Sequence, residues 1–118
     1  METPKIFESE YRFCEILWEH EPVTSGNLVR LCQEKLEWKK STTYTVIRRL
    51  TERGVLKSEN AVVTSLVSKE EVQSRESAEV VERTFSGSLP GFIAAFTRKK
   101  PLTRDEADEI QKIIDSYK

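Results

Sequence analysis

A polar helix that carries arginines and several hydroxyls is the part of this sequence best suited to bind a partner through hydrogen bonds and charge. The segment 41–54 reads SerThrThrTyrThrValIleArgArgLeuThrGluArgGly. At 100° per residue, its aliphatic side chains and Thr43 fall on one side, and its other hydroxyls, its phenol and two arginines face elsewhere. A helix that buries a narrow apolar stripe and exposes hydrogen-bonding groups and cations suits the major groove of DNA. The alternative is an ordinary solvated helix face.

Positive charge is concentrated around this helix. The 118 residues together carry a net charge of −1. Residues 1–34 hold three basic and seven acidic side chains, whereas residues 35–57 hold seven basic and two acidic ones, a net +5. A basic block of this kind is where contacts to DNA phosphates are expected. The coincidence of the basic block with the polar helix favours DNA binding.

Composition limits the other possibilities. A chain of this length forms one compact unit or two very small ones, and its modest apolar content favours a core shared with a second copy. No apolar run reaches membrane-spanning length and the N-terminus lacks a signal pattern, so we expect a cytoplasmic protein with no membrane partner. The two cysteines, Cys14 and Cys32, are too few for a disulfide scaffold and sit in apolar helical patterns.

The N-terminal half reads as a winged helix-turn-helix domain. Apolar spacing predicts helices at 8–20, about 25–35 and about 41–53, and Thr24 is a suitable N-cap for the second. Segments on either side of Glu59 and Asn60 are rich in β-branched residues and predict a short hairpin. Three helices followed by a hairpin make a winged helix, for which we predict the boundaries 1–67.

The C-terminal half, 68–118, reads as a separate helical region whose apolar faces need a partner surface. Capping boxes at Ser68 with Glu71 and at Thr103 with Glu106 open two helices. The predicted helices are 69–85, 89–96 and 104–117. None can bury its apolar side alone, so these side chains either fill a dimer core or fold back onto the winged helix. The residues expected in the dimer core are Phe85, Leu89, Phe92, Ile93, Phe96, Ile110 and Ile114.

The sequence therefore predicts a mainly α protein with a small β-hairpin and a defined set of DNA contacts. Thr42, Tyr44 and Thr45 are expected to face base edges, and the cations to neutralise phosphates. Thr42 could instead cap the helix, the cations could be ordinary surface charges, and Arg49 could tie the helix to an acidic residue of helix 8–20. The full predicted set is Lys39, Lys40, Ser41, Thr42, Tyr44, Thr45, Arg48, Arg49 and Lys57.

Other classes of function fit less well. The single histidine, His20, has no nucleophile or metal-ligand partner, and no glycine-rich phosphate loop is present, so we expect no enzyme, no metal and no cofactor. The strongest rival is a winged-helix module that binds proteins and has lost DNA binding, which the short acidic wing favours. A thiol sensor using Cys14 and Cys32 is a third possibility, disfavoured because buried cysteines are usually inert.

Several short motifs follow one another along nearly the whole chain: LeuTrpGlu at 17–19, ProValThr at 22–24, Trp38, Thr42-x-x-Thr45-x-x-x-Arg49-Leu50, Arg53-Gly54, LeuValSerLysGluGlu at 66–71 and PheSerGlySerLeu at 85–89. In their order and spacing they resemble the BlaI/MecI/CopY family of penicillinase-type transcriptional repressors. The resemblance implies that 1–67 is a winged-helix DNA-binding domain and 68–118 a helical dimerisation domain. It also implies a homodimer on a palindromic operator, repressing a resistance or stress-response operon until a signal removes it.

The chain departs from the family pattern in four places. Lys39-Lys40-Ser41 replaces a Ser-Pro start, so Ser41 is expected to become the helix cap. The wing is shorter and less basic than the resemblance implies. No cysteine follows Cys32, which argues against release by copper. The resemblance places cleavage by a sensor protease between Ala95 and Phe96, where an asparagine is typical at the alanine position.

Overall fold

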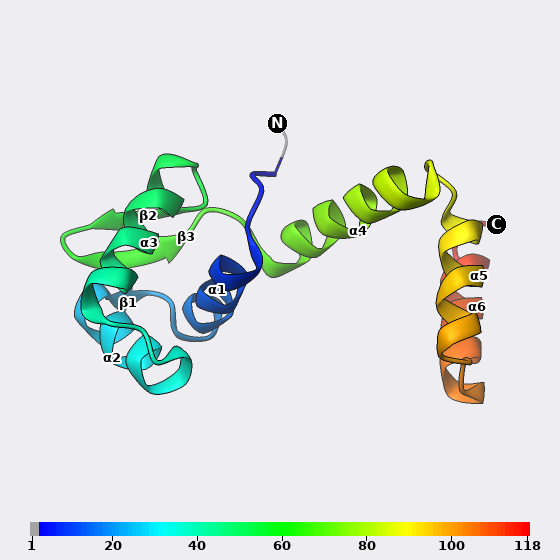
Figure 1. Ribbon diagram of the computed structural model, residues 1–118, viewed down its shortest axis with the longest axis horizontal. Coiled ribbons are helices and arrows are strands. Elements are labelled where there is room, and N and C mark those ends of the chain that lie inside the picture. Colours follow the sequence, from blue (N-terminus) through cyan, green and yellow to red (C-terminus); the bar gives the residue numbers. More distant parts are fainter. Residues whose placement is uncertain (1–2) are drawn as a thin grey trace. The chain divides into compact units, whose positions relative to one another are not determined.

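The computed structural model describes residues 3–118, which fall into two compact units, one within residues 1–77 and the other formed by Ala78–Lys118. Figure 1 shows the order of the elements along the chain. They are α1 (Glu8–His20), β1 (Val23–Thr24), α2 (Ser25–Leu36), α3 (Lys40–Glu52), β2 (Leu56–Glu59), β3 (Val62–Ser65), α4 (Lys69–Phe85), α5 (Leu89–Lys99) and α6 (Arg104–Asp115). Helix α4 begins in the first unit and ends in the second.

Helices α1, α2 and α3 form the predicted helix-turn-helix. The Thr24 hydroxyl accepts a hydrogen bond from the Asn27 N–H at 3.2 Å, which confirms the predicted cap of α2. Helix α2 ends at Leu36, and its C-cap, Glu37, has the left-handed conformation (φ 56°). The expectation that Ser41 caps α3 is wrong: the N-cap is Lys39, whose side chain makes no capping hydrogen bond, and Ser41 lies inside the first turn. The helix therefore begins one residue earlier than predicted.

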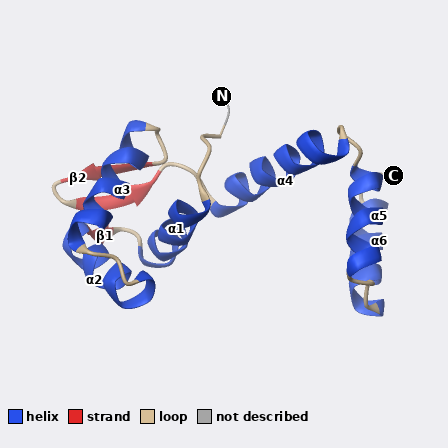
Figure 2. Ribbon diagram, viewed as in Figure 1, coloured by secondary structure: helices blue, strands red, loops and turns tan. Residues whose placement is uncertain are grey.

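The wing is a small antiparallel sheet of three strands in the order β1-β3-β2 (Figure 2). The hairpin predicted from the sequence is confirmed, and its turn places Asn60 and Ala61 at positive φ, as tight two-residue hairpins require. Strand β1 was not predicted, because two residues are too few to show the alternation of apolar and polar side chains that indicates a strand. The Glu21 carboxylate at the end of α1 accepts hydrogen bonds from the Ser65 N–H and hydroxyl at 2.8–2.9 Å. This contact fixes β3 to α1.

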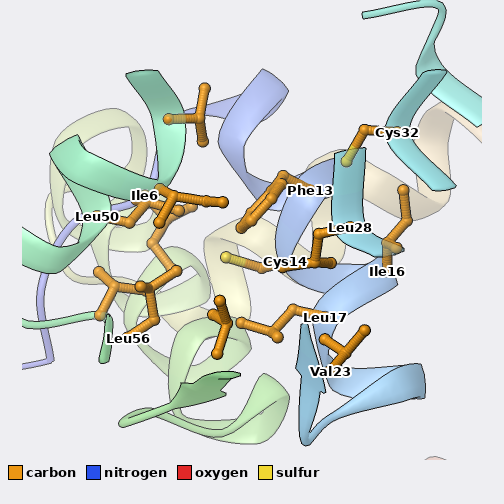
Figure 3. Close-up of a cluster of buried hydrophobic side chains, with 14 of the residues drawn as sticks. Ile6, Phe13, Cys14, Ile16, Leu17, Val23, Leu28, Cys32, Leu50 and Leu56 are labelled. Atoms are coloured by element: carbon orange, nitrogen blue, oxygen red, sulfur yellow. The ribbon is translucent and has the colours of Figure 1, made fainter. Parts of the chain in front are cut away.

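One hydrophobic core holds the helices and the sheet of the first unit together (Figure 3). Its fully buried side chains come from all three helices and from both hairpin strands: Phe13, Leu17, Leu28, Leu50, Leu56 and Val63. Trp18 packs against the edge of this core and donates its indole N–H to the Val67 carbonyl at 3.0 Å. Val72, near the start of α4, is also buried in it. The first turn of α4 is therefore part of the winged-helix core.

The second unit consists of helices without a buried side chain. Both predicted capping boxes are confirmed: Ser68 and Glu71 exchange the expected hydrogen bonds in the first unit, and Thr103 and Glu106 do so in the second. Helix α5 runs on to Lys99, further than predicted, because no residue before Lys100 breaks it. No residue between 78 and 118 is buried. The division between the two compact units falls after Ser77, inside α4. The boundary between residues 67 and 68, predicted for the functional domains, stays a prediction.

None of the helices in the described part of the chain is both long enough and apolar enough to span a membrane.

Candidate nucleic-acid interface

Helix α3 presents a polar face while its apolar stripe holds it in the core. Thr43, Val46, Ile47 and Leu50 are buried, as the helical spacing predicted. The other predicted contact residues on or beside α3 lie outside the core, all exposed except Thr45, which is half-buried: Lys39, Lys40, Ser41, Thr42, Tyr44, Thr45, Arg48 and Arg49. The structure thus brings eight of the nine predicted DNA-contact residues onto one element. The face combines hydroxyl, phenol and cationic groups, which can donate to base edges and phosphates.

The cations of α3 are available for a partner. Within residues 3–118, neither Lys39 nor Lys40 forms an ion pair, and the same holds for Arg48 and Arg49. The Lys40 Nζ lies 6.0 Å from the centre of the Tyr44 ring, within the range of a cation–π contact. Tyr44 is 41% exposed. A patch of unpaired cations beside an exposed ring attracts a polyanion such as DNA.

The wing adds little positive charge to this face. Lys57 lies on β2, apart from the other predicted contact residues, and its Nζ is 3.9 Å from a carboxylate oxygen of Glu59. Both side chains are exposed, so this pair is weak. The hairpin turn itself carries Asn60 and Ala61, neither of which is charged. Lys57 therefore lies apart from the cations of α3 and, unlike them, has a carboxylate beside it.

The C-terminal end of α3 is fixed to α1 by a two-pronged salt bridge. The Arg53 guanidinium donates to both carboxylate oxygens of Glu10, at 2.6 and 3.0 Å, and to the Lys5 carbonyl at 2.8 Å. The sequence suggested Arg49 for a tie to α1. Arg53 makes the direct contact, whereas Arg49 is exposed to solvent and acts on Glu10 only through its charge. The helical pattern did not find this pair because Arg53 lies just past the end of α3 and its partner is 43 positions away in the sequence.

Glu10 is ionised in this pair. Burial alone would raise the pKa of Glu10, but hydrogen bonds from Arg53 and the Phe7 N–H, together with the positive charges of Arg53 and Arg49, lower it overall. The same carboxylate raises the pKa of Arg53. A carboxyl group with a lowered pKa in the folded state stabilises the fold above its unfolded pKa, and this contribution is lost as the pH falls through the folded pKa.

Replacing Glu10 with glutamine is expected to lower the free energy of unfolding at pH 7 by about 1.5–3 kcal/mol, the range for hydrogen bonds to charged groups. Urea denaturation of the two proteins should converge as the pH is lowered through the folded pKa, because the wild-type carboxylate becomes protonated there. Glu8→Gln, an exposed change in the same helical turn, is the control and should have a smaller effect. A difference for Glu10→Gln that does not depend on pH would contradict the assignment.

The two cysteines are buried, which argues against a thiol sensor. Burial raises the pKa of Cys14 to about 12. Burial also raises the pKa of Cys32, and the neighbouring Thr43 hydroxyl acts in the opposite direction. The thiolate is the reactive form, and a raised pKa keeps both side chains in the unreactive thiol form at neutral pH.

We expect both thiols of the native protein to resist an aromatic disulfide reagent and to react fully once urea unfolds the chain. Absorbance of the released thiolate measures this directly. Rapid reaction of one thiol in the native state would support the thiol-sensor hypothesis instead.

The described residues also contain no group of three His, Cys, Asp or Glu side chains that could hold a metal ion. His20, the single histidine, places its Nδ1 2.9 Å from the Ile16 carbonyl of its own helix. Its position is that of a residue at a helix end, as the sequence suggested.

A winged helix whose third helix exposes unpaired cations and hydroxyls is typical of DNA-binding transcription regulators. Comparison with known proteins narrows the class. A family model described as "Penicillinase repressor" matches residues 6–116. The chain therefore belongs to the penicillinase repressor family, and it is a DNA-binding repressor rather than an enzyme.

Individual relatives are distant but match nearly end to end. The methicillin resistance regulatory protein MecI of Staphylococcus aureus is 25% identical over 116 residues, which cover 95% of this chain and 94% of MecI. The penicillinase repressor of Bacillus licheniformis is 20% identical over 119 residues, covering 98% of this chain and 93% of that protein.

A solved structure supports the fold of the winged helix. The solution structure of the Bacillus licheniformis BlaI monomeric form in complex with the blaP half-operator matches with a TM-score of 0.53 and 21% identity. The match covers 60% of this chain and 93% of that one. This likeness confirms the predicted winged-helix fold.

Proposed function

We propose that this repressor binds a palindromic DNA operator as a homodimer, with α3 of each copy in the major groove. The observation that carries the proposal is the exposed face of α3, where four cations have no ion-pair partner among residues 3–118. The buried stripe of α3 leaves this face free to enter a groove. The BlaI relative in the half-operator complex is a DNA binder of the same fold, which supports this role.

Within this proposal, Thr42, Tyr44 and Thr45 contact base edges. Threonine hydroxyls can donate or accept there, and the threonine methyl or the tyrosine ring can contact a thymine methyl. Lys39, Lys40, Arg48 and Arg49 contact phosphates, with Ser41 beside them in the first turn. Lys57 makes a smaller contribution, because Glu59 competes for its charge.

A homodimer is supported by the incomplete burial of the second unit. Leu89, Phe96 and Ile114 are 58%, 48% and 43% exposed, although a monomeric domain of this size would normally cover such side chains. Phe85, Phe92 and Ile110 are half-buried, and Ile93 is 38% exposed. A two-fold axis through this surface would set two copies of α3 in successive major grooves, which are about 34–36 Å apart.

The regulated genes are proposed to form a resistance or stress-response operon, as the names of the relatives suggest. If a sensor protease ends repression, the expected cut lies between Ala95 and Phe96. Both residues lie within α5, so the helix would have to unfold locally before a protease could bind it in an extended form.

The proposal is tested by selecting bound duplexes from a random DNA pool with the purified protein and following affinity against salt concentration. We expect a two-fold symmetric site and a steep loss of affinity with salt. Recovery of no sequence by a folded dimer would overturn DNA binding and favour the protein-interaction module, the alternative supported by the weakly charged wing.

A further inference from the structure

A cavity separate from the DNA-binding face lies where α1 and α4 meet. Its volume is about 350 Å³. Its lining residues all belong to the first unit: Ile6, Glu8, Tyr11, Gln73 and Glu76. Helix α4 is held beside α1 here by the buried Val72 and by an ion pair of 3.8 Å between Lys69 and Glu15. The cavity is therefore formed by packed elements and not by a loose loop.

The charge of this cavity has one sign. Glu8 and Glu76 contribute carboxylates, and no lysine or arginine lines it. The Oε1 atom of Glu76 is buried and has no hydrogen-bond partner among the described residues. A buried carboxylate oxygen without a partner leaves its negative charge uncompensated, so a ligand that brings a positive charge into the cavity gains binding energy.

The remaining walls are apolar. Ile6 is 4% exposed and belongs to the core, and the Tyr11 ring packs edge-on against Trp18 with ring centres 5.7 Å apart. An aliphatic and an aromatic wall beside carboxylates suit a ligand whose charge is embedded in apolar groups. A small hydrated ammonium ion would leave those walls unused.

We propose that this cavity binds a lipophilic organic cation, with the positive centre near Glu76 and the apolar groups against Ile6 and Tyr11. The proposal does not depend on the operator or on dimerisation, because every lining residue lies within the first unit of a single chain. A ligand that bridges α1 and α4 stabilises their packing, so its binding raises the melting temperature.

Tetraphenylphosphonium and tetraphenylborate test the proposal, because they share one shape and carry opposite charges. Calorimetric titration of the DNA-free protein avoids direct binding of the cation to DNA. We expect saturable binding of the phosphonium at one site per chain, a melting temperature that rises with its concentration, and no comparable response to the borate. Equal responses to both ions, or no binding of the phosphonium, would overturn the proposal.

Two variants locate the site. Glu76→Gln is expected to weaken phosphonium binding about tenfold, because it removes the charge and keeps the side-chain shape. Glu70→Gln, the same change on the same helix outside this cavity, should bind like the wild type. If Glu76→Gln fails to fold, Gln73→Trp, at an exposed position, should fill the cavity and abolish binding with both carboxylates intact. Unchanged affinity in Gln73→Trp, or in a folded Glu76→Gln, would place the cation elsewhere and refute the assignment.

Discussion

Replacing Ile93 with aspartate is expected to produce a monomer that binds a palindromic duplex about a hundredfold or more weakly than the wild type. A dimer gains this factor because the second half-site is bound at a high effective concentration once the first is held. Ile93 is 38% exposed on α5, so its change removes a proposed intersubunit contact without opening a core. Sedimentation velocity and titration of a fluorescent duplex measure the two effects together.

Ile93 gives a cleaner test than its neighbour Phe92. The Phe92 ring contacts Phe85 edge-on, with ring centres 5.5 Å apart, so a charge there would also disturb packing inside the second unit. Ala94→Asp is the matched control, because Ala94 is exposed and lies on the opposite side of α5 from the proposed dimer residues. A monomeric Ile93→Asp protein with unchanged operator affinity would refute the dimer model.

A second pair of variants is expected to separate base recognition from phosphate binding. Thr45→Ala should reduce the discrimination between operator and random duplex by about 1–3 kcal/mol, because Thr45 is proposed to contact a base edge. Lys40→Ala should weaken both duplexes about equally. Its plot of log K against log salt should be shallower by about 2, since each of two copies loses one phosphate contact worth about 0.9.

Competition titrations at several salt concentrations distinguish these outcomes. Lys57→Ala is the useful comparison for Lys40→Ala. It removes the same charge from β2, apart from α3 and beside the carboxylate of Glu59, so its effect on the salt dependence should be smaller. Equal loss of operator and random binding in Thr45→Ala would remove Thr45 from the base contacts. An unchanged salt dependence in Lys40→Ala would remove Lys40 from the phosphate contacts.

The Ile93→Asp variant also tests DNA binding by α3 independently of dimerisation. The Ile93→Asp monomer keeps an unaltered α3, so it should bind a half-operator duplex about as well as one arm of the wild-type dimer does. Its salt dependence on that duplex should be about half the wild-type value on the full site, because half the phosphates are contacted. Loss of half-site binding as well would indicate damage to the winged helix instead of loss of the dimer.

The main elements of the fold could be predicted because their signals are local. Helix α1 and helix α4 have the predicted bounds, and both capping boxes form as expected. Apolar spacing, N-cap hydroxyls and a β-branched hairpin each depend on residues within a few positions of one another. The buried stripe of α3, and hence the identity of its exposed face, followed from the same periodicity.

The contacts that orient this face depended on the tertiary structure. Arg53 is 43 positions from Glu10, and Ser65 is 44 positions from Glu21, so no local pattern pairs them. Strand β1 exists because two residues meet β3 across the sheet, not because they have a strand signal of their own. The N-cap of α3 is Lys39, which makes no side-chain capping hydrogen bond, although Ser41 has the better capping chemistry.

By itself, then, the sequence determined the helices, the hairpin, the basic block and the residues of the exposed face, because hydrophobic periodicity and local charge depend only on residues that are close together in the sequence. The tertiary structure decided which arginine holds α3 to α1, which cations stay unpaired, and that Glu8, Tyr11 and Glu76 share one cavity. These features need side chains from distant segments to meet. Their geometry is therefore fixed by the packing of the common core, and not by the pattern of any single element.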